Sequence, residues 1–238
     1  MKKRNFQPQK TLHSALLFLL LSVVGMTKSY AEDFDFSAVC STGQTLYYRI
    51  TNATTHEVEL TYPKRYFRTL YGSGGYNTNY NCYWYNYTRP TGNIMVPYYV
   101  EYNGISYSVT SIRDHTFGNH DFKSNTSHDA YIYDQCNDIT SVVIPSSVTT
   151  IGDDAFARCT GLTTVTIPTS MTSIGEYVFY NCSNLVTVNF NATNCSSVGS
   201  NTWNGCSSFT TLNLGNSVTR IPNNGFDGAT QLTSVTIP

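Results

Sequence analysis

Hydrophobic and polar positions in the second half of the chain repeat with a period of about 23 residues. Copies occupy residues 139–161, 162–184, 185–208 and 209–231, and a further copy begins at residue 232 and runs to residue 238. The apolar positions that recur are, in the copy 162–184, Leu162, Val165, Ile167, Met171, Ile174, Phe179 and Cys182. A fixed period of this length is typical of a solenoid, in which each repeat buries its apolar face against its neighbours.

Each repeat predicts a short strand followed by a turn. The strand is indicated by the alternation that ends at Ile167, and Pro168 ends it because proline has no amide donor for a ladder. The chain then turns at Gly175 and returns to the core at Phe179, and for this return the sequence predicts a short helical turn. We therefore expect one parallel sheet with one strand per repeat, and a spine of aromatic side chains. The spine positions are Phe156, Phe179, Trp203 and Phe226.

An earlier copy, residues 94–138, is interrupted by insertions. Its strand end, 94–97, reads Ile-Met-Val-Pro, and its segment 109–112, Val-Thr-Ser-Ile, matches Val-Thr-Thr-Ile at 148–151. One of the two insertions contains Asn103-Gly104, a dipeptide typical of a two-residue β-hairpin turn. We therefore expect the solenoid to span residues 94–238.

The repeat unit resembles the BspA-like class of leucine-rich repeats, which reads roughly L-T-S-V-T-I-P-x-S-V-T-S-I-G-x-x-A-F-x-x-C. Copies 139–161 and 162–184 match this unit nearly throughout, whereas copy 185–208 carries one inserted residue and copy 209–231 has Pro222 in place of glycine. The resemblance implies a solenoid of short parallel strands, turns and short helical segments. It also implies an exported protein, since BspA-like proteins include bacterial surface adhesins that bind host matrix proteins.

Residues 32–93 precede the repeats and predict a β-rich cap. Their apolar residues alternate along two segments, which suits a small antiparallel sheet covering the apolar end of the first repeat. The alternating residues are Leu46, Tyr48 and Ile50, then Val58 and Leu60. The segment also resembles the β-rich entry region of secreted Bacteroidetes proteins with BspA-like repeats.

Residues 1–31 have the features of a secretory signal peptide. Basic residues are followed by the apolar run Ala15–Val24 and by Ser29-Tyr30-Ala31, after which we expect cleavage. The alternative is a membrane anchor, but the apolar run is shorter than the roughly 20 residues that a spanning helix needs. We expect no membrane span after cleavage. The remaining chain has nine Lys and Arg against 15 Asp and Glu, a formal charge of −6, which argues against nucleic acid as a partner.

The cysteines follow the repeat register rather than a disulfide pattern. Five of the seven fall on inward positions, where a free cysteine packs as a small apolar side chain. These five are Cys136, Cys159, Cys182, Cys195 and Cys206. Bridges between adjacent repeats stay open as an alternative, and so does a disulfide between Cys40 and Cys82, which lie outside the register.

Two surfaces are candidates for ligand contact. The first is aromatic: 14 of the 19 tyrosines lie between Tyr47 and Tyr107, and we take Tyr83, Trp84 and Tyr85 as the contact residues there. The alternative for this segment is half-buried strand residues beside a flexible loop. The second is the outward face of the repeat strands, which is uncharged and rich in hydroxyl groups. Its candidate contact residues are Thr164, Thr166, Thr187, Asn189, Thr211 and Asn213. The alternative for this face is that threonine suits exposed strand positions and repeats along with the rest of the unit.

No motif for catalysis or cofactor binding is recognisable in the chain. Three His-Asp or Asp-His pairs, at residues 114–115, 120–121 and 128–129, lack the spacing of a metal site, and a polar surface loop explains them. We therefore expect a non-enzymatic protein, without cofactor or metal, that is secreted or displayed on the cell surface and binds an extracellular protein or glycan, most simply in adhesion. The alternative is a structural spacer or targeting module that presents a functional domain missing from this chain.

Overall fold

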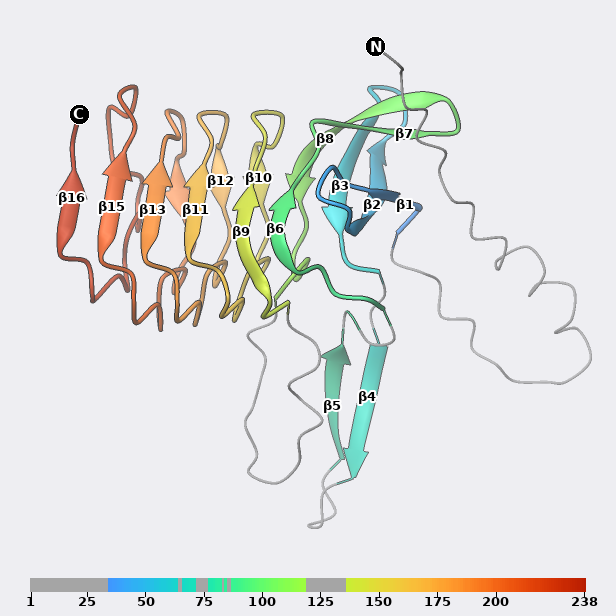
Figure 1. The fold of residues 1–238 in the computed structure, drawn as a ribbon, viewed down its shortest axis with the longest axis horizontal. Coiled ribbons are helices and arrows are strands. Elements are labelled where there is room, and N and C mark those ends of the chain that lie inside the picture. Colours follow the sequence, from blue (N-terminus) through green and yellow to red (C-terminus); the bar gives the residue numbers. More distant parts are fainter. Residues whose placement is uncertain (1–33, 64–65, 72–76, 83, 85–86, 119–135) are drawn as a thin grey trace, which may run out of the picture.

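The computed structural model describes residues 34–63, 66–71, 77–82, 84, 87–118 and 136–238. Their strands form two long sheets and one separate hairpin. In Figure 1 the two long sheets lie one behind the other along the solenoid. The strands β9, β11 and β13 are in front, and the shorter β10 and β12 are behind. Buried side chains from both sheets pack into a single core between them.

The front sheet contains one strand from each repeat, and all neighbouring strands are parallel. Its strands are β6 (Gly92–Met95), β9 (Ile139–Val143), β11 (Thr164–Ile167), β13 (Thr187–Phe190), β15 (Thr211–Leu214) and β16 (Ser234–Thr236). Each strand pairs with the equivalent residues of the next repeat, as in Thr164 with Thr187 and Ile167 with Phe190. The sequence therefore predicts this parallel sheet and its register correctly, but it misses the second short strand of each repeat, which pairs in the back sheet.

The back sheet joins the N-terminal strands to the solenoid. It contains β1 (Phe36–Val39), β2 (Thr45–Asn52), β3 (Glu57–Thr61), β8 (Ile105–Ile112), β10 (Thr150–Ile151), β12 (Ser173–Ile174) and β14 (Ser197–Val198), with β7 (Tyr99–Tyr102) paired to β8. The strands β1, β2 and β3 are antiparallel, as the alternation predicts, but β3 then pairs in parallel with β8. The N-terminal sheet is thus continuous with the solenoid.

A third sheet consists of β4 (Tyr66–Tyr71) and β5 (Asn77–Cys82), which pair antiparallel from Tyr66 opposite Cys82 to Tyr71 opposite Asn77. Figure 1 shows this hairpin extending away from the two long sheets.

The interrupted first copy has the register that its spacing predicts. Ile94 pairs with Val142 in the front sheet, and Ile112 pairs with Ile151 in the back sheet. Its inserted hairpin turns at Asn103 and Gly104, whose φ angles of 51° and 78° are those of a type I′ turn.

The inward positions of the repeats form the core. Every recurring apolar residue of the copy 162–184 is at most 2% exposed. The spine aromatics stack from repeat to repeat, with ring centroids 5.3 Å apart for Phe117 and Phe156, 5.5 Å for Phe156 and Phe179, and 5.0 Å for Phe179 and Trp203. The predicted spine is therefore confirmed.

The predicted helical turns are wrong, since the described residues contain no helix. A residue with a left-handed backbone conformation recurs at every fourth position of these segments, as at Asp154 (φ 59°) and Arg158 (φ 61°). This conformation interrupts a right-handed helix. Amides between these positions bond to the next repeat instead, as when Phe156 N donates to Val178 O at 3.0 Å. Inter-repeat hydrogen bonds therefore replace the local bonds of a helix.

The five cysteines at inward positions of the repeats are buried and free, as predicted. Three of them donate a thiol hydrogen bond to the backbone carbonyl of a spine residue one repeat earlier: Cys159 to Phe117 (3.6 Å), Cys182 to Phe156 (3.1 Å) and Cys206 to Phe179 (3.0 Å). Cys40 is also a free thiol, so the disulfide considered between Cys40 and Cys82 is not formed. Its sulfur instead lies 3.0 Å from the Thr42 hydroxyl.

Candidate functional site

The outward residues of the front sheet stand in two columns that cross the strands. The first column is uncharged and polar throughout, and consists of Asn93, Ser141, Thr164, Thr187, Thr211 and Ser234. Parallel strands lie about 4.8 Å apart, so the column presents one short polar side chain at each such step. Three of the predicted contact residues, Thr164, Thr187 and Thr211, are brought together here.

The second column lies two residues further along each strand, on the same face. It consists of Met95, Val143, Thr166, Asn189, Asn213 and Thr236. Asn189 Nδ2 donates to Thr166 Oγ1 at 3.1 Å, and Asn213 Nδ2 donates to Asn189 Oδ1 at 2.9 Å. The other three predicted contact residues therefore form one hydrogen-bonded row with fixed side-chain positions.

Hydroxyl groups on this face differ in what they bond. Thr163 and Thr233 each donate to a backbone carbonyl of the preceding repeat, at 3.2 Å and 3.3 Å. Within the described part of the chain, no side-chain hydrogen bond is made by Thr164, Thr187 or Thr211. Ser141, in the same column, donates to Asn93 Oδ1 at 2.8 Å, so the hydroxyls of this column that stay available to a ligand are those of the three threonines.

The second column changes character toward the N-terminal end of the solenoid. Met95 is 40% exposed and Val143 is 47% exposed, and the two residues are paired across β6 and β9. Tyr98 and Tyr99, with ring centroids 4.7 Å apart, are also exposed, but Tyr99 begins β7 and thus belongs to the back sheet. The two columns therefore combine polar, uncharged side chains at the centre with the apolar side chains of Met95 and Val143 at one end.

Trp84, predicted as a contact residue, is part of the core instead. It is 1% exposed, and its ring stacks on Phe117 at a centroid distance of 6.3 Å, which extends the aromatic spine by one member. Its indole Nε1 donates to Thr116 O at 2.9 Å. Tyr47 packs against its edge. The prediction of Trp84 as a ligand contact is wrong for this reason, whereas Tyr83 and Tyr85 lie outside the described residues.

Of the three His-Asp or Asp-His pairs, the structure describes only the first, Asp114 and His115. Both residues follow β8, and His115 Nδ1 is 3.7 Å from Asp154 Oδ2. The pairs at 120–121 and 128–129 lie outside the described residues. Among the residues with described positions, no three His, Cys, Asp or Glu side chains gather closely enough to hold a metal ion. In the same part of the chain, no helix has the length and apolar character to cross a membrane.

Comparison with known proteins identifies the repeats. The model of a family described as "BspA type Leucine rich repeat region (6 copies)" matches residues 126–238. No curated protein matches the chain.

One solved structure supports the fold. The chain is similar to a leucine rich cell surface protein from Faecalibacterium prausnitzii, with a TM-score of 0.52 and 20% identity over 87% of this chain and 44% of that chain. Weaker similarity links it to a leucine rich repeat protein of T. pallidum (TM-score 0.49, 16% identity, 80% of this chain and 78% of that chain). The chain spans less than half the length of the Faecalibacterium protein. At this identity the likeness concerns the fold alone.

Proposed function

Because the chain is a BspA-type leucine-rich repeat protein over residues 126–238, we propose that it is a non-enzymatic binding protein of the cell surface. Its ligand is an extracellular protein, held by the front face that the two columns define. Adhesion is the simplest role for such a protein. The export of the chain rests on the signal-like segment 1–31, and the surface location is further supported by the similarity to a protein described as a cell surface protein.

The observation that carries this proposal is the row of hydroxyl groups at Thr164, Thr187 and Thr211. These side chains are held on adjacent parallel strands, and they make no side-chain hydrogen bond within the described residues. Threonine is short, so little conformational freedom is lost when such a hydroxyl binds a partner. A rigid row of this kind suits a partner that offers hydrogen-bonding groups along an extended surface.

The apolar end of the face favours a protein as that partner. Met95 and Val143 are both exposed and adjacent, and methionine is enriched in the cores of protein interfaces, from which charged residues are depleted. A glycan would use the hydroxyl row, but it would leave the two aliphatic side chains uncovered.

The proposal is tested by binding. The purified chain is titrated against immobilised extracellular-matrix proteins and against a glycan panel, with calorimetric unfolding as a control that the sample is folded. Saturable binding to a matrix protein is expected. Binding to glycans alone would contradict a protein as the ligand of the front face. A folded sample that binds nothing in either panel would contradict the proposal and favour the alternative, a spacer that presents another domain.

A further inference from the structure

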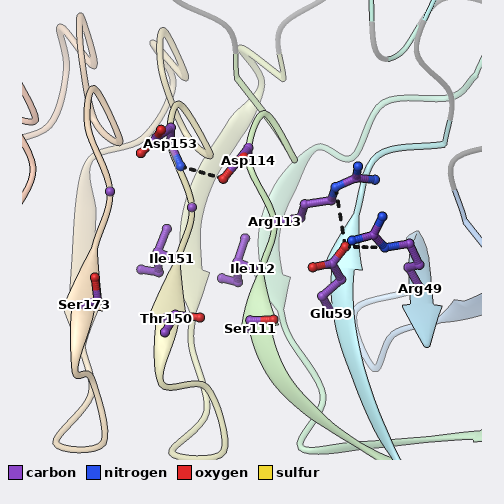
Figure 2. Close-up of a pocket in the computed structure, with 12 residues that line it drawn as sticks. Arg49, Glu59, Ser111, Ile112, Arg113, Asp114, Thr150, Ile151, Asp153 and Ser173 are labelled. Carbon is purple, nitrogen blue, oxygen red and sulfur yellow. Dashed lines mark hydrogen bonds and ion pairs between the residues drawn. The ribbon is translucent and has the colours of Figure 1, made fainter. Parts of the chain in front are cut away.

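A polar pocket lies on the outward side of the back sheet, on the other side of the core from the front face. One row of the sheet crosses it, in which each residue pairs with the next on the neighbouring strand. The row consists of Arg49, Glu59, Ser111, Thr150, Ser173 and Ser197, of which all but Ser197 line the pocket. Figure 2 shows the hydroxyls of Ser111, Thr150 and Ser173 on three successive strands.

Two glycines line the pocket beside this row, at positions where the preceding repeat approaches the backbone closely. Gly152 and Gly175 occupy in later repeats the position that Arg113 has in the first. A Cβ atom on Gly152 would lie 2.5 Å from the Asp114 amide nitrogen, and one on Gly175 would lie 2.7 Å from the Asp153 amide nitrogen. No side chain fits at either position. The pocket has a volume of about 490 Å³, which is in the range of small-ligand sites.

Hydrogen-bond donors form one wall of the pocket. Glu59 Oε1 holds two guanidinium groups, with Arg49 Nε at 2.7 Å and Arg113 Nε at 3.4 Å. Arg113 also lies over the Tyr62 ring, 5.0 Å from its centroid. Burial raises the pKa of Glu59, and the two arginines oppose this shift by favouring its charged form. One carboxylate therefore holds both guanidinium groups at this wall (Figure 2).

Acceptors form the other side. Asp114 Oδ1 accepts a hydrogen bond from Asp153 N at 2.9 Å, and Asp153 Oδ1 accepts one from Glu176 N at 2.7 Å. These bonds fix both aspartates at the rim, and both side chains remain exposed. Each carboxylate retains a second oxygen, Oδ2, as a further acceptor. The pocket therefore has donors at one side, acceptors at the other and hydroxyl groups along its floor.

We propose that this pocket binds a neutral, polyhydroxylated ligand, such as a single sugar ring of a glycan. A phosphate or carboxylate ligand would approach Glu59, Asp114 and Asp153, whereas a cation would approach Arg49 and Arg113. A sugar hydroxyl both donates and accepts, so neighbouring hydroxyls on one ring bind the aspartates and the arginines without a charge conflict. The site is separate from the front face and does not depend on the function proposed for that face.

The matched variants Ser173→Tyr and Ser197→Tyr test the site. Both serines are exposed and occupy the same row of the back sheet, but only Ser173 lines the pocket. The ¹⁵N-labelled chain is titrated with methyl α-mannopyranoside, methyl β-galactopyranoside and methyl β-glucopyranoside. Inorganic phosphate and calcium serve as the charged probes. Amide chemical shifts report the location of binding, and the dispersion of the spectrum reports folding.

At least one of the neutral sugars is expected to shift the amides of Thr150, Gly152 and Ser173 saturably, with a Kd in the millimolar range. Ser173→Tyr should weaken that binding at least tenfold, and Ser197→Tyr should change it less than twofold. Asp114→Asn, which keeps Oδ1 as the acceptor for Asp153 N, should weaken it by a smaller factor. The proposal is overturned if no neutral sugar binds there, if phosphate or calcium binds more tightly than the sugars, or if both tyrosine variants have the same effect.

Discussion

The rings of Phe179 and Trp203 stack across two adjacent repeats, with centroids 5.0 Å apart and planes inclined by 13°. Neither side chain is exposed. Each is one member of a continuous aromatic spine from Trp84 through Phe117, Phe156 and Phe179 to Trp203. Because each repeat contacts only its neighbours in a solenoid, this stack links the stability of every repeat to that of the next.

Phe179→Ala should destabilise the chain by about 3–5 kcal/mol, because it removes a fully buried ring and leaves a cavity between Phe156 and Trp203. Urea unfolding followed by circular dichroism measures this loss. Val186→Ala, at a 41% exposed position of the front face, is the matched control and should change the free energy of unfolding by less than about 0.5 kcal/mol. Similar losses for the two variants would contradict the buried spine.

The buried position of Trp84 has a spectroscopic consequence. In the variant Trp203→Phe, Trp84 is the single remaining tryptophan, and its emission should be blue-shifted and resistant to quenching by iodide. Strong quenching in a folded sample would instead place this indole at the surface.

A second change at the same residue tests its hydrogen bond. Trp84→Phe removes the donor to Thr116 O and leaves that carbonyl buried, which should cost about 1–3 kcal/mol of the free energy of unfolding. A loss below about 0.5 kcal/mol is what an exposed contact residue would give.

The thiol column makes stability fall at alkaline pH. Burial raises the pKa of Cys159 and Cys182, and it raises the pKa of Cys206 to about 12. In the unfolded chain, thiols ionise near pH 8.5, so above that pH the unfolded state binds fewer protons than the folded state. The free energy of unfolding should therefore decrease as pH rises from about 8.5, by up to about 2 kcal/mol per thiol at pH 10.

Cys182→Ala separates this effect from packing. At pH 7 the variant should be less stable than the unmodified chain, because a buried side chain has become smaller. Between pH 7 and pH 10 it should lose less stability than the unmodified chain, because one ionisable thiol is gone. Equal losses over this interval, measured by urea midpoints, would contradict burial of a neutral Cys182.

The fold could be predicted where the repeats supply several copies of the same information. The inward positions, the parallel register and the cysteine column all follow from aligning the copies, and even the interrupted copy 94–138 is found by the spacing of its Val-Thr-Ser-Ile segment. The turns could not be predicted in the same way. The residues around Phe156 favour a helical turn locally, but their amides bond to the next repeat, and a single copy contains no sign of that partner.

The candidate sites, too, could be predicted only where the repeats align. The two columns of the front face follow from the strand alternation, whereas Trp84 lies outside the repeat register and its spine position has no counterpart to align with. The back-sheet pocket depends on the pairing of Glu59 with Ser111, residues far apart in sequence. Aligning the repeats places Gly152 and Gly175 at the position of Arg113, but the alignment does not show which side chains line the pocket beside them.

The most direct test of the central claim is the Kd of the matrix-protein complex for two arginine variants. Thr187→Arg places a long charged side chain in the middle of the first column, and Ser197→Arg places the same side chain on the back sheet. If the front face binds the partner, Thr187→Arg should raise the Kd at least tenfold and Ser197→Arg less than twofold. Equal values for the two variants, or a larger effect from Ser197→Arg, would contradict the account.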